Sequence, residues 1–102
     1  MALTERDFTA QVIQYAKLRG WVVAHFRPAL TDKGWRTPVQ GDAGFPDLVL
    51  ARRGHIIFME LKSEKGKLSR EQESWLDALE GPGVVVDVFK PSDWPEIEHL
   101  LT

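Results

Sequence analysis

The chain has 102 residues, 43% of them hydrophobic, which is enough for one hydrophobic core and predicts a single domain over residues 1–102. It contains no cysteine, which excludes disulfides, thiolate catalysis and cysteine zinc sites, and its three histidines are scattered. The formal net charge is -2 and no apolar run exceeds four residues, so we expect a cytoplasmic protein without a membrane span. The glycine patterns that bind nucleotides are missing, so no nucleotide cofactor is expected.

The first predicted element is a helix over residues 5–19. Thr4 is a typical N-cap, and Gly20 stands where helices commonly end. Glu5 lies in line with the apolar stripe of this helix, which is formed by Phe8, Val12 and Tyr15. Two roles for Glu5 remain open: a first-turn acid that interacts favourably with the helix macrodipole, or a carboxylate directed into a site.

A β-rich run at residues 21–26 predicts the first strand. Residues 27–45 follow, a stretch too long for an ordinary connector and rich in glycine and proline. We expect it to form a mobile functional loop, in which Trp35 stacks on a ligand or covers the core.

Residues 46–62 predict two antiparallel strands joined by a tight turn at Arg53-Gly54. If these two residues form the loop, counting outward places Asp47 directly opposite Glu60, with Lys62 on the same face of the sheet. The predicted apolar floor of that face consists of Val49, Ala51, Ile56 and Phe58.

Two carboxylates held this close disfavour each other's ionisation unless a cation compensates them. Mg²⁺ and Mn²⁺ prefer hard oxygen ligands and take phosphate oxygens in their remaining positions. The alternative interpretation is a solvated face on which Lys62 pairs with one of the acids.

A second long helix is predicted to start at the N-cap Ser69 and to end before Gly81. Gln72 stands at the capping-box position but also faces the core, so capping and a role in the site both remain open. The expected buried face of this helix contains Trp75, Leu76 and Leu79. A strand at residues 84–89 and a short helix at residues 92–101 follow.

The predicted order is helix, three strands, helix, strand and short helix. A strand that returns after a helix requires a crossover connection, so the fold class is α/β, with a mixed sheet flanked by helices.

At this point the chain resembles a known family. The matching segments, in order, are Gly44-Phe45-Pro46-Asp47-Leu48, Met59-Glu60-Leu61-Lys62, Leu68-Ser69, Gln72 and Trp75-Leu76. They resemble the VRR-NUC branch of the PD-(D/E)XK nucleases, and the short chain is similar to stand-alone, bacteriophage-type members. The family core has the same α-β-β-β-α-β order, and the helix with Glu5 also fits.

The resemblance implies a metal site in which Asp47 and Glu60 bind Mg²⁺, with Mn²⁺ as a substitute. The main-chain carbonyl of Leu61 would add a ligand, and Glu5 would complete or support the acidic set.

The resemblance also implies that Lys62 positions the attacking water and stabilises charge at the phosphate, while Gln72 holds Lys62 or the water network. The expected function is a Mg²⁺-dependent, structure-selective DNA endonuclease, most specifically a Holliday-junction resolvase acting as a homodimer. Flap or nicking cleavage, or DNA binding without turnover, are the alternatives. A phage-encoded protein of this kind would act in the host cytoplasm.

The net charge of -2 is unusual for a DNA-binding protein, because affinity for DNA depends on basic residues that neutralise phosphates. We expect a basic surface near the site and acidic residues elsewhere. The candidate DNA-binding residues are Arg27, Lys33, Arg36, Arg52, Arg53, Lys65 and Lys67.

Overall fold

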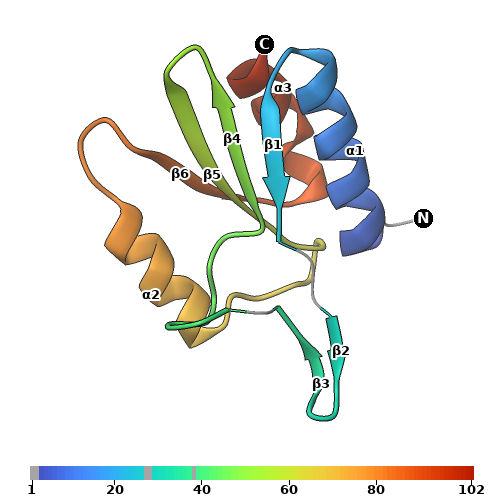
Figure 1. The fold of residues 1–102 in the computed structure, drawn as a ribbon. Helices are drawn as coiled ribbons and strands as arrows, with labels where there is room; N and C mark the ends of the chain where they lie inside the picture. Colours follow the sequence, from blue (N-terminus) through green and yellow to red (C-terminus); the bar gives the residue numbers. More distant parts are fainter. Residues whose placement is uncertain (1–2, 27–28, 38) are drawn as a thin grey trace.

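The structure is a computed structural model that describes residues 3–26, 29–37 and 39–102, with only the backbone at positions 29, 31 and 36. The elements in chain order are α1 (Glu5–Leu18), β1 (Val22–His25), β2 (Ala29–Thr31), β3 (Gly34–Arg36), β4 (Leu48–Arg52), β5 (His55–Leu61), α2 (Arg70–Leu79), β6 (Val85–Phe89), the 3₁₀ turn η1 (Pro91–Asp93) and α3 (Trp94–Leu101). A four-stranded sheet of order β1-β4-β5-β6 forms the centre (Figure 1).

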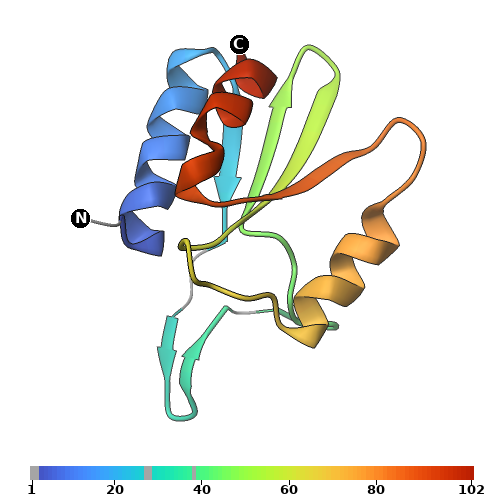
Figure 2. The same ribbon diagram turned by 180° about the vertical axis from the view of Figure 1, so that it is seen from behind.

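The sheet is mixed, because β1, β4 and β5 pair antiparallel and β6 pairs parallel to β5. This confirms the predicted α/β class. Helices α1 and α3 lie side by side on one face of the sheet, as Figures 1 and 2 both show. The core between them and the sheet contains Phe8, Val12, Ala16, Trp21, Leu48, Leu50, Ile57, Met59, Leu61, Phe89, Ile97 and Leu101. No helix in the described part of the chain is long and apolar enough to cross a membrane.

Helix α1 starts as predicted at the N-cap Thr4, whose hydroxyl accepts a hydrogen bond from the Asp7 N–H at 3.1 Å. Its buried positions are Phe8, Thr9, Val12 and Ala16. Tyr15, the third residue of the predicted stripe, is half-buried and packs against this core, with its ring edge-on to Trp94 of α3 and the centroids 5.4 Å apart. Glu5 is exposed, because the first turn of α1 extends past the end of the core.

The β4–β5 hairpin has the predicted turn and register. Arg53 and Gly54 have φ values of 50° and 84°, and Arg52 pairs with His55. Positive φ at both central residues is the type I′ geometry that matches the twist of the flanking strands. Leu48 pairs with Met59, so the next position outward sets Asp47 against Glu60.

The long segment before Asp47 is not only a loop. Strands β2 and β3 form a separate two-stranded hairpin that extends away from the main sheet (Figures 1 and 2). We call residues 29–36 the β2–β3 arm. Trp35 lies on this arm and is exposed, so the prediction that it covers the core was wrong. The sequence did not predict these two strands, because each has only three residues, too few to show a periodic pattern.

Helix α2 has the predicted capping box, in which Ser69 and Gln72 each accept a hydrogen bond from the other's N–H, at 3.1 and 2.9 Å. The predicted face of Trp75, Leu76 and Leu79 is the less exposed side of the helix, but it is only half-buried, and no residue of this helix is fully buried. Trp75 packs on the segment before β4: its Nε1 donates to the Asp42 carbonyl at 3.0 Å, and its ring lies 4.9 Å from Phe45.

Gly44 fixes this packing, because it brings the segment before Asp47 into backbone contact with the first turn of α2. A Cβ at Gly44 would lie 2.6 Å from the Glu71 carbonyl carbon and 2.8 Å from the Gln72 nitrogen, and its φ is +98°. Only glycine therefore fits at this position.

We predict that Gly44→Ala lowers the free energy of unfolding by about 2–5 kcal/mol, since it adds a backbone clash to an unfavourable φ. Gly41→Ala is the matched control, because Gly41 also has positive φ but no atom within 4 Å of its Cβ position. Urea unfolding of both variants measures the difference. Equal losses would show that the close approach to α2 contributes nothing.

Candidate active site

The carboxylate end of the β4–β5 hairpin is fixed by main-chain hydrogen bonds. The Asp47 carbonyl accepts from the Phe26 N–H at 3.0 Å, which ties the start of β4 to the end of β1. The Asp47 carboxylate accepts from the Leu61 N–H at 2.9 Å, which directs it toward the end of β5. Asp47 is therefore oriented by both neighbouring strands.

Glu60 is a buried acid with an incomplete set of partners. The residue is 1% exposed, and its Oε1 accepts a hydrogen bond from Gln72 Nε2 at 3.4 Å. Its Oε2 is buried without a hydrogen-bond partner. Burying a carboxylate oxygen unpaired is costly, so this atom needs either a proton or a cation.

Burial raises the pKa of Glu60 from 4.5 to about 9, and Asp47 adds to the shift through a hydrogen bond and through its charge. The Lys62 ammonium acts against the shift, and Glu5 adds to it more weakly. Without a metal, Glu60 therefore holds a proton at neutral pH. A divalent cation would replace that proton and satisfy both acids at once.

The Leu61 carbonyl points toward the same acids. In a strand, the N–H and C=O of one residue face the same side, and the Leu61 N–H donates to Asp47. The neighbouring Lys62 N–H faces the other way and donates to the Phe89 carbonyl at 3.0 Å.

Asp47, Glu60 and the Leu61 carbonyl together offer hard oxygen donors of the kind that Mg²⁺ and Mn²⁺ bind, so these residues fit such an ion. Within the described residues, no three His, Asp or Glu side chains are grouped closely enough to hold a metal by themselves. A metal here would therefore rest on two carboxylates and a main-chain oxygen, with water in the other positions.

Glu5 is brought to the edge of this group by the first turn of α1. Partial burial raises the pKa of Glu5, Lys62 lowers it and Asp47 raises it, so the three charges lie within electrostatic range of one another. The structure thus places Glu5 beside the site, where it contributes charge, but not in a three-carboxylate cluster.

Gln72 completes the cap of α2 and also contacts Glu60. Its Oε1 accepts from the Ser69 N–H at 2.9 Å as part of the cap, and its Nε2 donates to Glu60. The capping box of α2 therefore orients one of the two acids.

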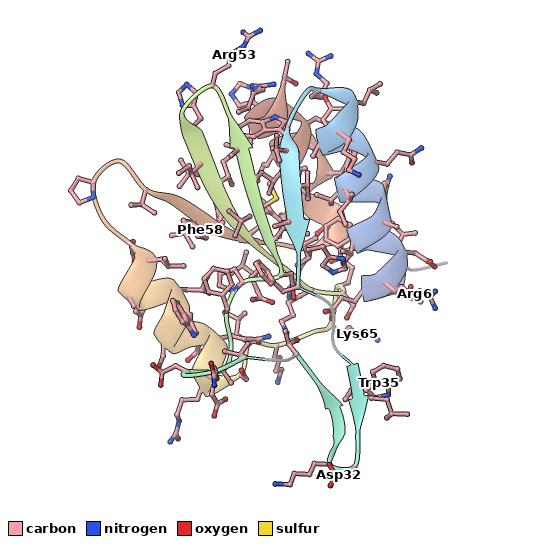
Figure 3. All side chains as sticks on the ribbon, viewed as in Figure 1. Arg6, Asp32, Trp35, Arg53, Phe58 and Lys65 are labelled. Atoms are coloured by element: carbon pink, nitrogen blue, oxygen red, sulfur yellow. The ribbon has the colours of Figure 1, made fainter. Side chains whose placement is uncertain are left out.

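The candidate DNA-binding residues divide into two groups. Lys65 and Lys67 are exposed on the segment that leaves β5, and Lys33 lies in the turn of the β2–β3 arm, so all three are at the carboxylate end. Arg53 lies at the opposite end, at the tip of the hairpin (Figure 3). The predictions for Arg27 and for the Arg36 side chain lie outside the described residues.

Arg52 has a structural environment that the sequence did not indicate. Its guanidinium donates to the carbonyls of Arg19, Leu101 and Thr102 at 2.8, 3.2 and 3.2 Å. It also stacks 4.3 Å from the Trp21 ring centroid. It joins the ends of α1 and α3 to the sheet, and two recesses of about 480 and 290 Å³ lie around it, far from the carboxylates.

The aromatic rings that support the site were not predicted from the sequence. The Phe45 ring lies 5.3 Å from Phe26, 6.0 Å from Phe58 and 4.9 Å from Trp75, in edge-to-face arrangements. Phe45, two residues before Asp47, thus joins β5, α2 and the residue that follows β1. The Gly-Phe-Pro run before Asp47 was the available signal, since Gly44 and the buried Pro46 restrict the backbone on both sides of this ring.

We predict that Glu60→Gln stabilises the metal-free protein at neutral pH. The pKa of Glu60 is raised on folding. Between pH 4.5 and about 9, the folded state therefore keeps a proton on Glu60 that the unfolded chain has lost. The contribution of this group to stability therefore falls as the pH rises through that window. In EDTA, Glu60→Gln should exceed the wild type by about 1–3 kcal/mol in the free energy of unfolding at pH 7.

Urea unfolding at several pH values measures this difference, which should shrink toward zero near pH 4.5. Glu73→Gln, at an exposed position of α2, is the control and should follow the wild type. A Glu60→Gln difference that is constant with pH would contradict the raised pKa.

The comparison with known proteins agrees with this geometry. The family model of the VRR-NUC domain matches residues 24–93, which include Asp47, Glu60, Lys62 and Gln72 but not Glu5. No curated protein and no solved structure gives a significant match. The match spans more than half of the chain, and the mixed sheet with its flanking helices is the PD-(D/E)XK-like arrangement of such domains. The chain therefore belongs to the VRR-NUC domain family of nucleases.

Proposed function

We propose that the chain is a Mg²⁺-dependent DNA endonuclease whose metal is held by Asp47, Glu60 and the Leu61 carbonyl, with Mn²⁺ as a substitute. The observation that carries this proposal is the buried, partnerless Oε2 of Glu60 beside the carboxylate of Asp47. Without a metal, the two acids can be buried together only while Glu60 keeps a proton, and a bound cation would replace that proton and satisfy both carboxylates.

The bound metal would supply Lewis-acid stabilisation of the phosphate and a more acidic water. Residues of the chain would provide the other groups that the reaction needs. Lys62 adds a compact positive charge on the same side as the acids, where it orients the attacking water and stabilises charge that develops on the phosphate oxygens. Gln72 holds Glu60 in place, and Glu5 balances the charge of Lys62.

The proposed domain spans residues 1–102 and thus extends beyond the matched residues 24–93. Helix α1 supports this extension, because it contributes Phe8, Val12 and Ala16 to the core and brings Glu5 to the site.

The proposed substrate is branched DNA, with the four-way Holliday junction as its most specific form. Support comes from the resemblance to stand-alone members of the family and from the basic residues Lys33, Lys65 and Lys67 at the carboxylate end. Cutting two strands of a junction symmetrically requires two active sites, so this substrate goes with a two-fold homodimer.

The second face of the sheet supports a homodimer. It carries the alternate residues of the strands, and at its hairpin end Val22 and Ile56 are 74% and 52% exposed. Uncharged β-branched residues exposed on a sheet favour contact with a similar surface, which a second copy of the chain provides.

We predict that the purified protein cleaves labelled four-way junctions in Mg²⁺ or Mn²⁺ and not in EDTA. Lys62→Ala and Asp47→Asn should each lower the cleavage rate by about 100-fold or more, as is usual when one charge-stabilising group is lost. Lys17→Ala, at an exposed lysine in the last turn of α1, is the control and should cleave like the wild type.

The same assay includes a flap, a nicked duplex and a linear duplex of matched sequence. Faster cleavage of flaps or nicks than of junctions would replace the junction assignment with that substrate. Failure to cleave any of them in either metal would refute the enzymatic proposal.

We predict that Ile56→Glu converts a dimeric wild type into a monomer, because it places a charge on the proposed apolar contact. Sedimentation equilibrium at micromolar concentration measures this. Leu18→Glu, at an exposed leucine of α1 on the other side of the sheet, is the matched control and should stay dimeric. A wild type that sediments as a monomer would remove the homodimer.

A further inference from the structure

The β2–β3 arm carries an exposed apolar pair that neither the core nor the proposed catalytic residues use. Leu30 and Trp35 pair directly across the two strands, so their side chains share one face of the arm. They are 69% and 65% exposed and do not belong to the core cluster. A short two-stranded hairpin is marginally stable alone, so a flat apolar partner on this face would stabilise it.

The arm stands at the catalytic end of the molecule. The chain enters it just after Phe26, which hydrogen-bonds to the Asp47 carbonyl, and returns to the site through Gly44. In both ribbon views the arm extends beyond the end of the sheet opposite to the Arg53-Gly54 turn (Figures 1 and 2). In Figure 3, Trp35 projects from the arm on the side of Lys65 and Arg6.

Exposed cations at this end offer charge contacts to an anionic partner, although Asp7 and Asp32 are exposed there too. Arg6, Lys65 and Lys67 are exposed. Glu64, the acid next to Lys65, is engaged elsewhere, since its carboxylate accepts hydrogen bonds from the N–H and the hydroxyl of Ser92. An aromatic ring beside several cations is the combination by which proteins hold unpaired nucleic acid: bases stack on the ring, and the cations follow the phosphates.

We propose that Leu30 and Trp35 form a stacking platform for an unstacked base of the substrate. This inference rests on the proposed nuclease function and makes the enzyme selective for DNA in which base stacking is interrupted next to the cleaved phosphate. Bases inside an intact duplex are stacked on each other and do not present a free face to the ring. Branch points, gaps and frayed ends do, so the platform recognises DNA structure without reading sequence.

The test measures binding in EDTA, so that cleavage does not interfere. Two labelled DNAs of the same sequence are compared by fluorescence anisotropy: an intact duplex and a duplex with a short single-stranded gap. Trp35→Ala should weaken binding of the gapped DNA by about 5- to 100-fold, the usual loss for one stacked base, and leave binding of the intact duplex unchanged. Trp35→Phe keeps a ring and should retain most of the affinity.

Leu18→Ala is the matched control, because Leu18 is another exposed leucine but lies at the far end of α1; it should bind both DNAs like the wild type. Since Trp35 is outside the core, the thermal unfolding of Trp35→Ala should match the wild type. Equal losses on both DNAs, or no loss on the gapped DNA, would overturn the platform. Absence of metal-dependent cleavage by the wild type would instead refute the nuclease proposal, and the EDTA binding data would still decide the role of the arm.

Discussion

The register of the β4–β5 hairpin is the constraint on which the site depends. Arg53 and Gly54 take up positive φ, and from that turn outward each residue of β4 has one fixed partner on β5. A slip of one residue would turn every side chain of one strand to the opposite face. A slip of β5 would take Glu60 away from Asp47 and place its carboxylate beside Leu48 and Leu50 of the core. The two-residue turn therefore determines both the apolar packing and the meeting of the acids.

The close approach of these two acids destabilises the folded state. The sheet buries Glu60 beside Asp47, leaves one of its oxygens without a partner and raises its pKa to about 9. Hydrophobic packing of α1 and α3 on the other face of the sheet offsets the cost of burying such a group. Destabilised acids of this kind concentrate at functional sites because a cation, when bound, recovers the cost. One face of the sheet thus carries the hydrophobic core, and the other carries the buried acids.

The sequence was sufficient for features controlled by local chemistry. Residue type and strand alternation predict the Thr4 and Ser69 caps, the Arg53-Gly54 turn and the opposition of Asp47 and Glu60.

The sequence was insufficient where tertiary contacts decide the position of a side chain. Trp75 follows an amphipathic pattern that predicts burial against the sheet, yet it packs on the segment before β4. Arg52 suggested phosphate binding, yet both of its terminal nitrogens donate to main-chain carbonyls at the ends of two helices. Nothing in the spacing of these residues distinguishes the two outcomes.

The position of α2 follows from the same segment that delivers Asp47. Because no residue of α2 is buried, the helix is not held by the core. Besides its contacts with β6, the helix is attached by the close approach of Gly44 to Glu71 and Gln72, the packing of Trp75 on Phe45, and the hydrogen bond from Gln72 to Glu60. Two of these lie in the three residues before Asp47, and the third ends on the other acid. The Gly-Phe-Pro run and the Gln72–Glu60 hydrogen bond thus connect α2 to both acids, although the helix and the acids lie on different segments of the sequence.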